Sequence, residues 1–173
     1  MTREASPPKD KPRKGASRAG NKRTAARLGA VQALYQMDIA GGDLPSTLAE
    51  FEAHRLGREL DGEQYGDADA AFFRDLVTGV VREQLRIDRL VDRVLQTSWP
   101  LKRIDLTLRN ILRAGTYELL YRKDVPARAA ITEYVDVAHG FYEDDGPRLV
   151  NGVLDSIARE ERADEVSAKR AGT

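Results

Sequence analysis

The sequence predicts an all-α fold: two small helical bundles packed together, with about six to seven helices. Three observations support this prediction. Apolar residues recur at steps of three and four in successive segments, as they do on one face of an α-helix. No segment alternates convincingly between apolar and polar residues, which is the pattern of a half-buried strand. Two strong helix-ending signals, Gly41-Gly42 and Trp99-Pro100, separate the helical segments.

The N-terminal subdomain is expected to span residues 21–98 and to begin with a helix near Asn21, which ends at Gly41-Gly42. A second, shorter helix is expected from Leu44 to Leu60, followed by a loop, "DGEQYGDADA". The expected apolar faces comprise Leu28, Val31, Leu34, Tyr35 and Ile39 in the first helix, and Leu48, Phe51 and Leu56 in the second.

The third helical segment, "DADAAFFRDLVTGVVREQLRIDRLVDRVLQ", is long, and Asp69 is its candidate N-cap. Gly79 in its interior costs about 1 kcal/mol relative to alanine. We therefore expect close packing or a bend near this glycine. Trp99-Pro100 ends the helix, because the residue before a proline avoids the α region. This pair is the candidate boundary between the two subdomains.

The C-terminal subdomain is expected to span residues 99–161 and to contain three helices. These run from Asp105 to Tyr121, from Ala127 to Tyr142, and from Gly146 to about Glu161. The tail of residues 162–173 is polar, and we expect it to be frayed.

The composition argues against several classes of protein. The chain has no cysteine and only two histidines, which excludes thiolate zinc sites and disulfides and disfavours a histidine-based metal site. No phosphate-binding glycine loop or nucleophile motif is present, so we expect neither an enzyme nor a cofactor. No apolar run is long enough to span a membrane, and no secretory signal is recognisable, which fits a cytoplasmic protein.

The charge of the chain is distributed unevenly. Residues 1–27 hold nine basic and two acidic side chains, a net charge of +7, so in this neutral chain the remainder carries −7. Residues 1–20 lack apolar periodicity and are expected to form a disordered basic arm. Such an arm suggests a nucleic-acid partner, although a solubilising tail explains the same composition.

The start of the first helix is a candidate RNA-binding surface. Arg23 and Arg27 are one helical turn apart and project from one face, and Lys22 adds a neighbouring charge. Guanidinium groups contact phosphates and stack on exposed bases. The alternative is a first helical turn that is merely solvated, although basic residues there oppose the helix dipole.

Four blocks of sequence resemble the NusB family of bacterial transcription antitermination factors. They are "RLGAVQALYQMD", "FFRDLVTGVV", "LRNILRAGTYELLYRKDVPARAAITEYVDVAHGF" and "RLVNGVLDSIARE", and they occur in the family's order over most of residues 23–160. The resemblance implies an all-helical fold of two bundles. It also implies binding to boxA RNA of ribosomal RNA leaders as a heterodimer with NusE, a small-subunit ribosomal protein. Within an antitermination complex, this pair helps RNA polymerase resist termination.

The resemblance assigns roles to particular residues. It implies RNA contacts at Arg23 and Arg27, where Thr24, Ala25 and Ala26 interrupt the denser arginine run of the family. It links Tyr35 to partner binding, and a core aromatic is the alternative role.

The turn "EDDGPR" and the residue after it match a second family RNA contact, formed by Asp145, Arg148 and Leu149. Arg148 would bind phosphate, and Asp145 would accept hydrogen bonds from base amines. Asp145 could equally cap the following helix or interact with its dipole, and the two roles are compatible. Leu149 occupies a position that is often phenylalanine in the family.

Two alternatives remain open. The same helical fold serves as an RNA-binding appendage of ribosomal RNA cytosine methyltransferases, but those enzymes need a cofactor-binding α/β domain and catalytic cysteines, neither of which this chain contains. The chain could also form a homodimer in the absence of RNA and thereby cover its own binding surface.

Overall fold

The structure is a computed structural model that describes residues 18–56, 69–95 and 104–166, and it confirms the all-α fold. In these residues the helices are α1 (Arg18–Ala40), α2 (Leu44–His54), α3 (Ala70–Leu95), α4 (Leu106–Tyr121), α5 (Ala127–His139) and α6 (Asp145–Glu161), and no strand is present. A further helical turn follows at 163–166. None of the described helices is long and apolar enough to cross a membrane.

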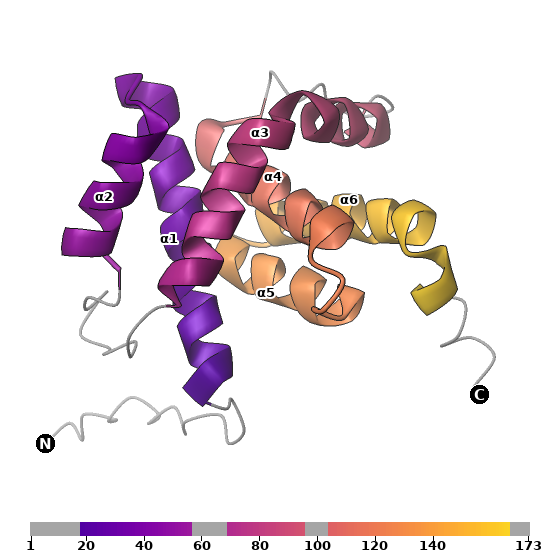
Figure 1. Cartoon of the computed structure of the whole chain (residues 1–173). Helices are drawn as coiled ribbons and strands as arrows, with labels where there is room; N and C mark the ends of the chain where they lie inside the picture. Colours follow the sequence, from indigo (N-terminus) through magenta and orange to yellow (C-terminus); the bar gives the residue numbers. More distant parts are fainter. Residues whose placement is uncertain (1–17, 57–68, 96–103, 167–173) are drawn as a thin grey trace, which may run out of the picture.

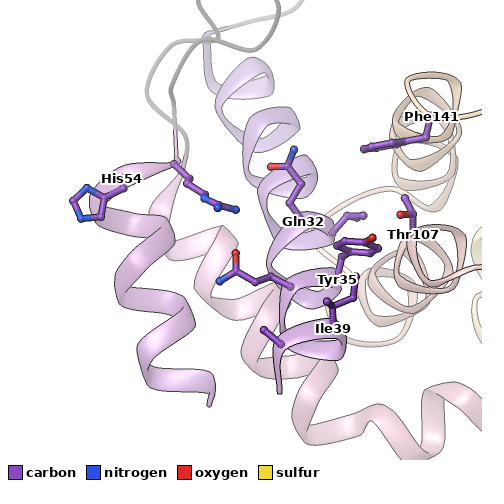
Figure 2. A pocket seen from close by; sticks show the side chains of 10 residues that line it. Gln32, Tyr35, Ile39, His54, Thr107 and Phe141 are labelled. Carbon is purple, nitrogen blue, oxygen red and sulfur yellow. The ribbon is translucent and has the colours of Figure 1, made fainter. Parts of the chain in front are cut away.

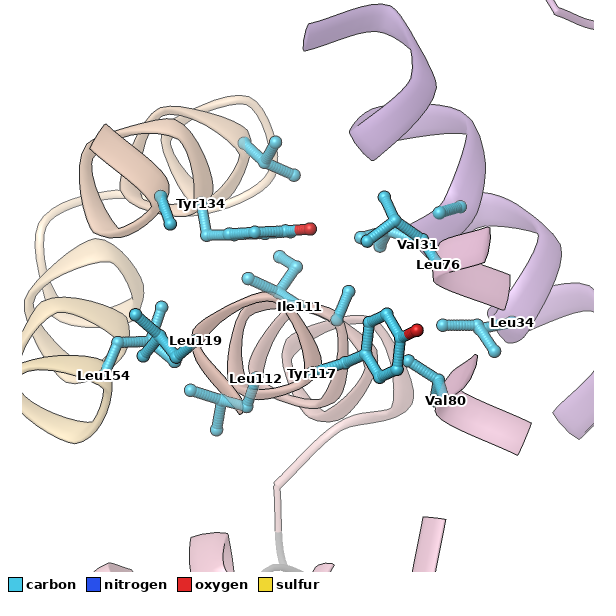
Figure 3. Close-up of a cluster of buried hydrophobic side chains, with 14 of the residues drawn as sticks. Val31, Leu34, Leu76, Val80, Ile111, Leu112, Tyr117, Leu119, Tyr134 and Leu154 are labelled. Carbon is cyan, nitrogen blue, oxygen red and sulfur yellow. The ribbon is translucent and has the colours of Figure 1, made fainter. Parts of the chain in front are cut away.

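Helix α4 lies at the centre of the molecule. It packs against α1, α3, α5 and α6, and every residue from Asn110 to Leu120 is buried. Helix α2 packs on the other side of α1, against α1 and the first part of α3 (Figure 1). One continuous apolar core therefore joins the N-terminal and C-terminal helices, and it takes side chains from five of them: Val31, Leu76, Ile111, Tyr134 and Leu154 (Figure 3).

The helix boundaries agree with the prediction at some ends and differ at others. Helix α1 begins at Arg18 rather than Asn21 and ends before Gly41, whose φ of 66° suits glycine. Helix α2 ends at His54, because the carbonyl of Phe51 accepts both the Arg55 and the Leu56 amide and so closes the last turn. The predicted end near Leu60 lies outside the described residues, as do the Trp99-Pro100 boundary and residues 1–17 of the basic arm.

In the C-terminal part of the chain, α5 ends at His139, three residues before the predicted end at Tyr142. The Gly140 amide bonds to the carbonyl of Val137, three residues back, which tightens the final turn. The chain then turns, and α6 begins at Asp145.

Local side-chain caps start two of the helices. The Asp69 carboxylate accepts a hydrogen bond from the Phe72 amide at 2.9 Å, so the N-cap predicted for the third helix is confirmed. Asp105 caps α4 in the same way, through the Leu108 amide at 3.0 Å. These caps fix the first turns of the two helices that form the centre of the core.

Gly79 lies where α3 crosses α4. A Cβ atom at this position would lie 2.1 Å from Cζ of Tyr117, a distance that no side chain tolerates. The prediction of close packing at this glycine is therefore confirmed. The missing side chain leaves room for the Tyr117 ring, whose hydroxyl donates a hydrogen bond to Asp75 at 2.9 Å.

Three residues are not buried or exposed as predicted. Tyr35 and Ile39 were expected on the apolar face of the first helix but are 40% and 59% exposed. Arg162 was expected in a frayed tail but is only 5% exposed. Its guanidinium donates to the backbone carbonyls of Glu118, Leu119, Arg122 and Val125. It thereby satisfies carbonyls at the end of α4, and residues 162–166 belong to the fold.

A buried ion pair connects α1 to α4. Arg27 is 4% exposed, and Glu118 is completely buried. The Arg27 Nη2 atom lies 2.7 Å from Glu118 Oε1, and Nε lies 3.0 Å from both carboxylate oxygens. Burial alone lowers the pKa of the Arg27 guanidinium, but the hydrogen bond to Glu118 and the electrostatic attraction of the neighbouring acidic groups together outweigh this effect and raise the pKa above its usual value.

Breaking this pair should destabilise the protein strongly. Glu118→Gln leaves the buried guanidinium with only the longer ion pair to the partly exposed Glu133, so the free energy of unfolding should fall by about 3–5 kcal/mol in urea denaturation. Arg23→Ala, one turn away on the same helix, is the matched control and should cost less than about 1 kcal/mol, because its ion pairs are partly exposed. Equal losses in the two variants would contradict the structural role assigned to Arg27.

Candidate nucleic-acid interface

The first half of the candidate interface lies along α1. Because α1 begins at Arg18, Lys22 and Arg23 lie in its second turn, and their backbone amides are not at the helix terminus. The Lys22 side chain is exposed, and its carbonyl accepts the Asp69 amide at 3.1 Å, which holds this part of α1 beside the start of α3.

Arg23 is partly exposed and only loosely paired. Its guanidinium lies 3.8 Å from Asp69 and 3.6 Å from Asp124, and the side chain is 35% exposed. The guanidinium also lies 4.6 Å from the centre of the Phe72 ring, in cation–π geometry. This arrangement orients the Arg23 head group while its carboxylate contacts remain long and partly solvated.

Two more arginines surround the same ring. Arg27 and Arg122 each lie 5.0 Å from the centre of Phe72, and we call Arg23, Arg27, Arg122 and Phe72 the Phe72 cluster. The hydrogen bond from Arg122 holds the pKa of the Asp124 carboxyl below its usual value, so Asp124 stays ionised beside the cluster. Because the carboxylates of Asp69, Glu118 and Asp124 pair with its three arginines, the cluster is not an isolated basic patch.

The expected RNA contact through Arg27 does not fit its position. Arg23 and Arg27 do share one face of α1, as their spacing indicated, but in the third turn this face points toward α4. The Arg27 guanidinium donates hydrogen bonds to Glu118, and its Nη1 atom also lies 3.6 Å from a carboxylate oxygen of Glu133. Arg27 is thus part of the scaffold that positions Arg23.

The second half of the candidate interface lies at the start of α6. Asp145 and Arg148 are both exposed and separated by about one turn. Neither takes part in an ion pair with any residue that the structure describes. Asp145 lies in the first turn, where a carboxylate interacts favourably with the helix dipole, so this role and base recognition are compatible. Leu149 is half-buried and packs against the core, which leaves only part of its side chain accessible.

Helix α5 connects the two helices that carry the halves of the interface. It packs against both α1 and α6, and the Thr24 hydroxyl donates a hydrogen bond to Glu133 of α5 at 2.9 Å. No hydrogen bond or ion pair within the described part of the chain joins Arg23 directly to Arg148. The two halves are therefore held in relation to each other through α5.

A groove lies at the other end of α1 (Figure 2). It has a volume of about 710 Å³, and Tyr35, Ile39, Thr107 and Phe141 contribute to its wall. Tyr35 is 40% exposed, so it is not the core aromatic that one interpretation of the sequence expected. Ile39 and Phe141 are exposed in the same groove. This cluster was not predicted, because Phe141 is 106 positions from Tyr35 in the chain and the contact depends on the tertiary fold.

Sequence reasoning also missed the acidic partners of the arginines. Glu118 was a recognisable signal, since it is a carboxylate in the otherwise apolar stretch "TYELLY". A buried acid needs a cationic or hydrogen-bonding partner. The sequence alone did not indicate which of the 28 basic residues would be that partner.

Comparisons with known proteins identify the family of the chain. The model of the NusB family matches residues 24–159. The transcription antitermination protein NusB of Bradyrhizobium sp. strain BTAi1 is 54% identical over 98% of this chain and 100% of its own length. The NusB protein of Rhodopseudomonas palustris strain TIE-1 is 60% identical over 87% of this chain and 86% of its own length.

Solved structures show the same fold. The structure of T. maritima NusB has a TM-score of 0.69 and 31% identity, and the match covers 84% of this chain and 96% of that one. A crystal structure of antitermination factors NusB and NusE in complex with dsRNA has a TM-score of 0.66 and 25% identity, over 80% of this chain and 97% of that one. The chain belongs to the NusB family.

Proposed function

We propose that this protein is an RNA-binding transcription antitermination factor that recognises boxA RNA together with NusE and helps RNA polymerase resist termination. The observation that carries the proposal is the match to an antitermination protein NusB over essentially the whole length of both chains. The alternative hypothesis, an RNA-binding appendage of a methyltransferase, gains no support. The named relatives are antitermination proteins, and they match this chain over most or all of their own length. The similarity to a NusB in complex with NusE and dsRNA supports both proposed partners.

The accessible basic residues support the RNA part of the proposal. Lys22 and Arg148 are exposed, and Arg23 is held only by long ion pairs with Asp69 and Asp124. A phosphate could replace these carboxylates at modest cost, because partly exposed ion pairs contribute little free energy. The Phe72 ring would continue to orient the Arg23 guanidinium during the exchange. Asp145, beside Arg148, supplies an acceptor for a base amine.

The groove around Tyr35 supports the partner part of the proposal. It combines exposed aromatic and aliphatic side chains with polar ones such as Gln32 and Gln36, a mixture common at protein interfaces. It lies toward the end of α1 opposite to Lys22 and Arg23, so NusE bound in the groove would leave this half of the RNA surface open. We propose that NusE covers Tyr35, Ile39 and Phe141.

The RNA surface predicts a specific salt dependence. The double variant Arg23→Ala, Arg148→Ala should bind a boxA-containing RNA more weakly. The slope of log affinity against log salt should become shallower by about 0.7 for each phosphate of a single-stranded RNA that the variant no longer neutralises. Fluorescence anisotropy across a salt series measures both quantities. The control is Arg74→Ala, Arg159→Ala, which removes two exposed charges paired elsewhere. If both double variants gave the wild-type slope, the RNA contacts would have to lie elsewhere, for example in the arm.

Substitutions in the groove should weaken the binding of NusE without changing the affinity for RNA. Tyr35→Ala and Phe141→Ala should each weaken NusE binding by about tenfold, the cost of a well-packed interface aromatic, in isothermal titration calorimetry. The affinity of each variant for RNA in the absence of NusE should remain unchanged and is the internal control. Unchanged NusE affinity would exclude this groove as the binding surface. A wild-type dimer that these substitutions dissociate in light scattering would instead show that a second copy covers the groove.

A further inference from the structure

The second half of α3 carries an apolar hollow bordered by arginines. It has a volume of about 410 Å³ and is lined by Leu85, Arg86, Arg89, Leu90 and Arg93. Leu85 is 69% exposed, more than any other large hydrophobic residue in the described part of the chain. We call this surface the Leu85 hollow.

The helical periodicity of α3 does not require a leucine at this position. The buried face of the helix carries Val80, Ile87 and Val91 at steps of seven and four. Residue 85 is two positions before Ile87 and therefore points away from that face, toward solvent. A single exposed leucine is ordinary, but here a second, partly buried leucine, Leu90, and three arginines line the same hollow.

The arginines at the rim are only partly neutralised. Arg93 pairs with Glu160 of α6. Arg86 donates a hydrogen bond at 2.8 Å to the Tyr121 hydroxyl, a neutral partner that orients its guanidinium without cancelling the charge. Neither Arg86 nor Arg89 forms an ion pair with a described residue.

The acids on this half of α3 are largely engaged elsewhere. Glu83 pairs with Arg82 at 3.2 Å and accepts a hydrogen bond from Tyr121, and the charge of Arg86 contributes more weakly to lowering the pKa of Glu83. Asp88 is bound by Arg113 through two hydrogen bonds of 2.7 and 2.8 Å. Asp92 is the only other acid on this part of the helix, so the rim of the hollow keeps an excess of positive charge.

We propose that the Leu85 hollow binds an acidic amphipathic segment of a partner protein. An apolar side chain of that segment would cover Leu85 and Leu90, and flanking carboxylates would pair with Arg86 and Arg89, for which the guanidinium fork is suited. RNA would match the charge, but its backbone offers no aliphatic group to cover an exposed leucine. A protein segment satisfies both features of the surface.

The hollow is separate from the proposed RNA and NusE surfaces. At 1.5 Å per residue, Leu85 lies about 20 Å from Phe72 as measured along α3. Its lining shares no residue with the Tyr35 groove. Occupation of the Leu85 hollow would therefore be compatible with both proposed partners, and its test does not depend on either.

A synthetic peptide can test the proposal with the full-length protein. The probe is a fluorescein-labelled amphipathic peptide with leucines on one face and glutamates beside them. Two matched peptides replace the glutamates by lysines or the leucines by serines. In fluorescence anisotropy, only the acidic leucine peptide should bind with measurable affinity. Leu85→Ala and Arg89→Glu should each weaken its binding by at least about tenfold, or about 1.4 kcal/mol.

Arg128→Glu on α5 is the matched control for charge, because Arg128 is exposed and lies outside the hollow. It should leave the peptide affinity within about twofold of wild type, a difference of about 0.4 kcal/mol. Equal effects of Arg128→Glu and Arg89→Glu, or no effect of Leu85→Ala, would overturn the proposal. So would displacement of the peptide by a single-stranded RNA whose own binding Leu85→Ala leaves intact. Self-association abolished by Leu85→Ala, without peptide binding, would overturn it too, because the occupant would then be a second copy.

Discussion

The ion pair between Arg27 and Glu118 is the constraint on which the arrangement of the helices depends. Glu118 lies on the central helix and is completely buried, so its charge is tolerated only with a hydrogen-bonded partner. Arg27 supplies that partner from α1, 91 positions away. A second polar contact between the same helices lies at the other end of α1, where Asp38 accepts hydrogen bonds from Asn110 and Arg113 of α4. The buried ion pair fixes where Arg23, one turn earlier, lies.

The arginines of this protein consequently divide into two groups. Arg27, Arg113 and Arg162 are buried, and each bonds to acidic side chains or backbone carbonyls that would otherwise be unsatisfied. Arg23 and Arg148 keep accessible guanidiniums. The first group holds α1, α3, α4 and α6 together, and the second is available to a ligand. A guanidinium suits both purposes, because it remains charged when buried and forms several directed hydrogen bonds.

The sequence predicted what depends on local interactions. The helices, the Asp69 cap and the close packing at Gly79 follow from periodicity, capping preference and the lack of a side chain. The burial of Arg27 could not be predicted, because an arginine on an amphipathic helix has the same neighbours in sequence whether it faces solvent or a distant acid. The burial of Arg162 could not be predicted for the same reason, because the carbonyls that it binds come from α4 and the turn after it. Local patterns therefore indicated the elements, and long-range polar contacts decided which basic residues are accessible.

Guanidinium NMR offers the most direct test of this division. In a protein labelled at arginine, the Nε–H resonances report the contacts of each guanidinium separately. On addition of boxA RNA, the Arg23 and Arg148 signals should shift, whereas the Arg27 signal should stay in place and exchange slowly with water, because Glu118 retains it. A shift of the Arg27 signal comparable to that of Arg23, or its rapid exchange in the free protein, would contradict the account.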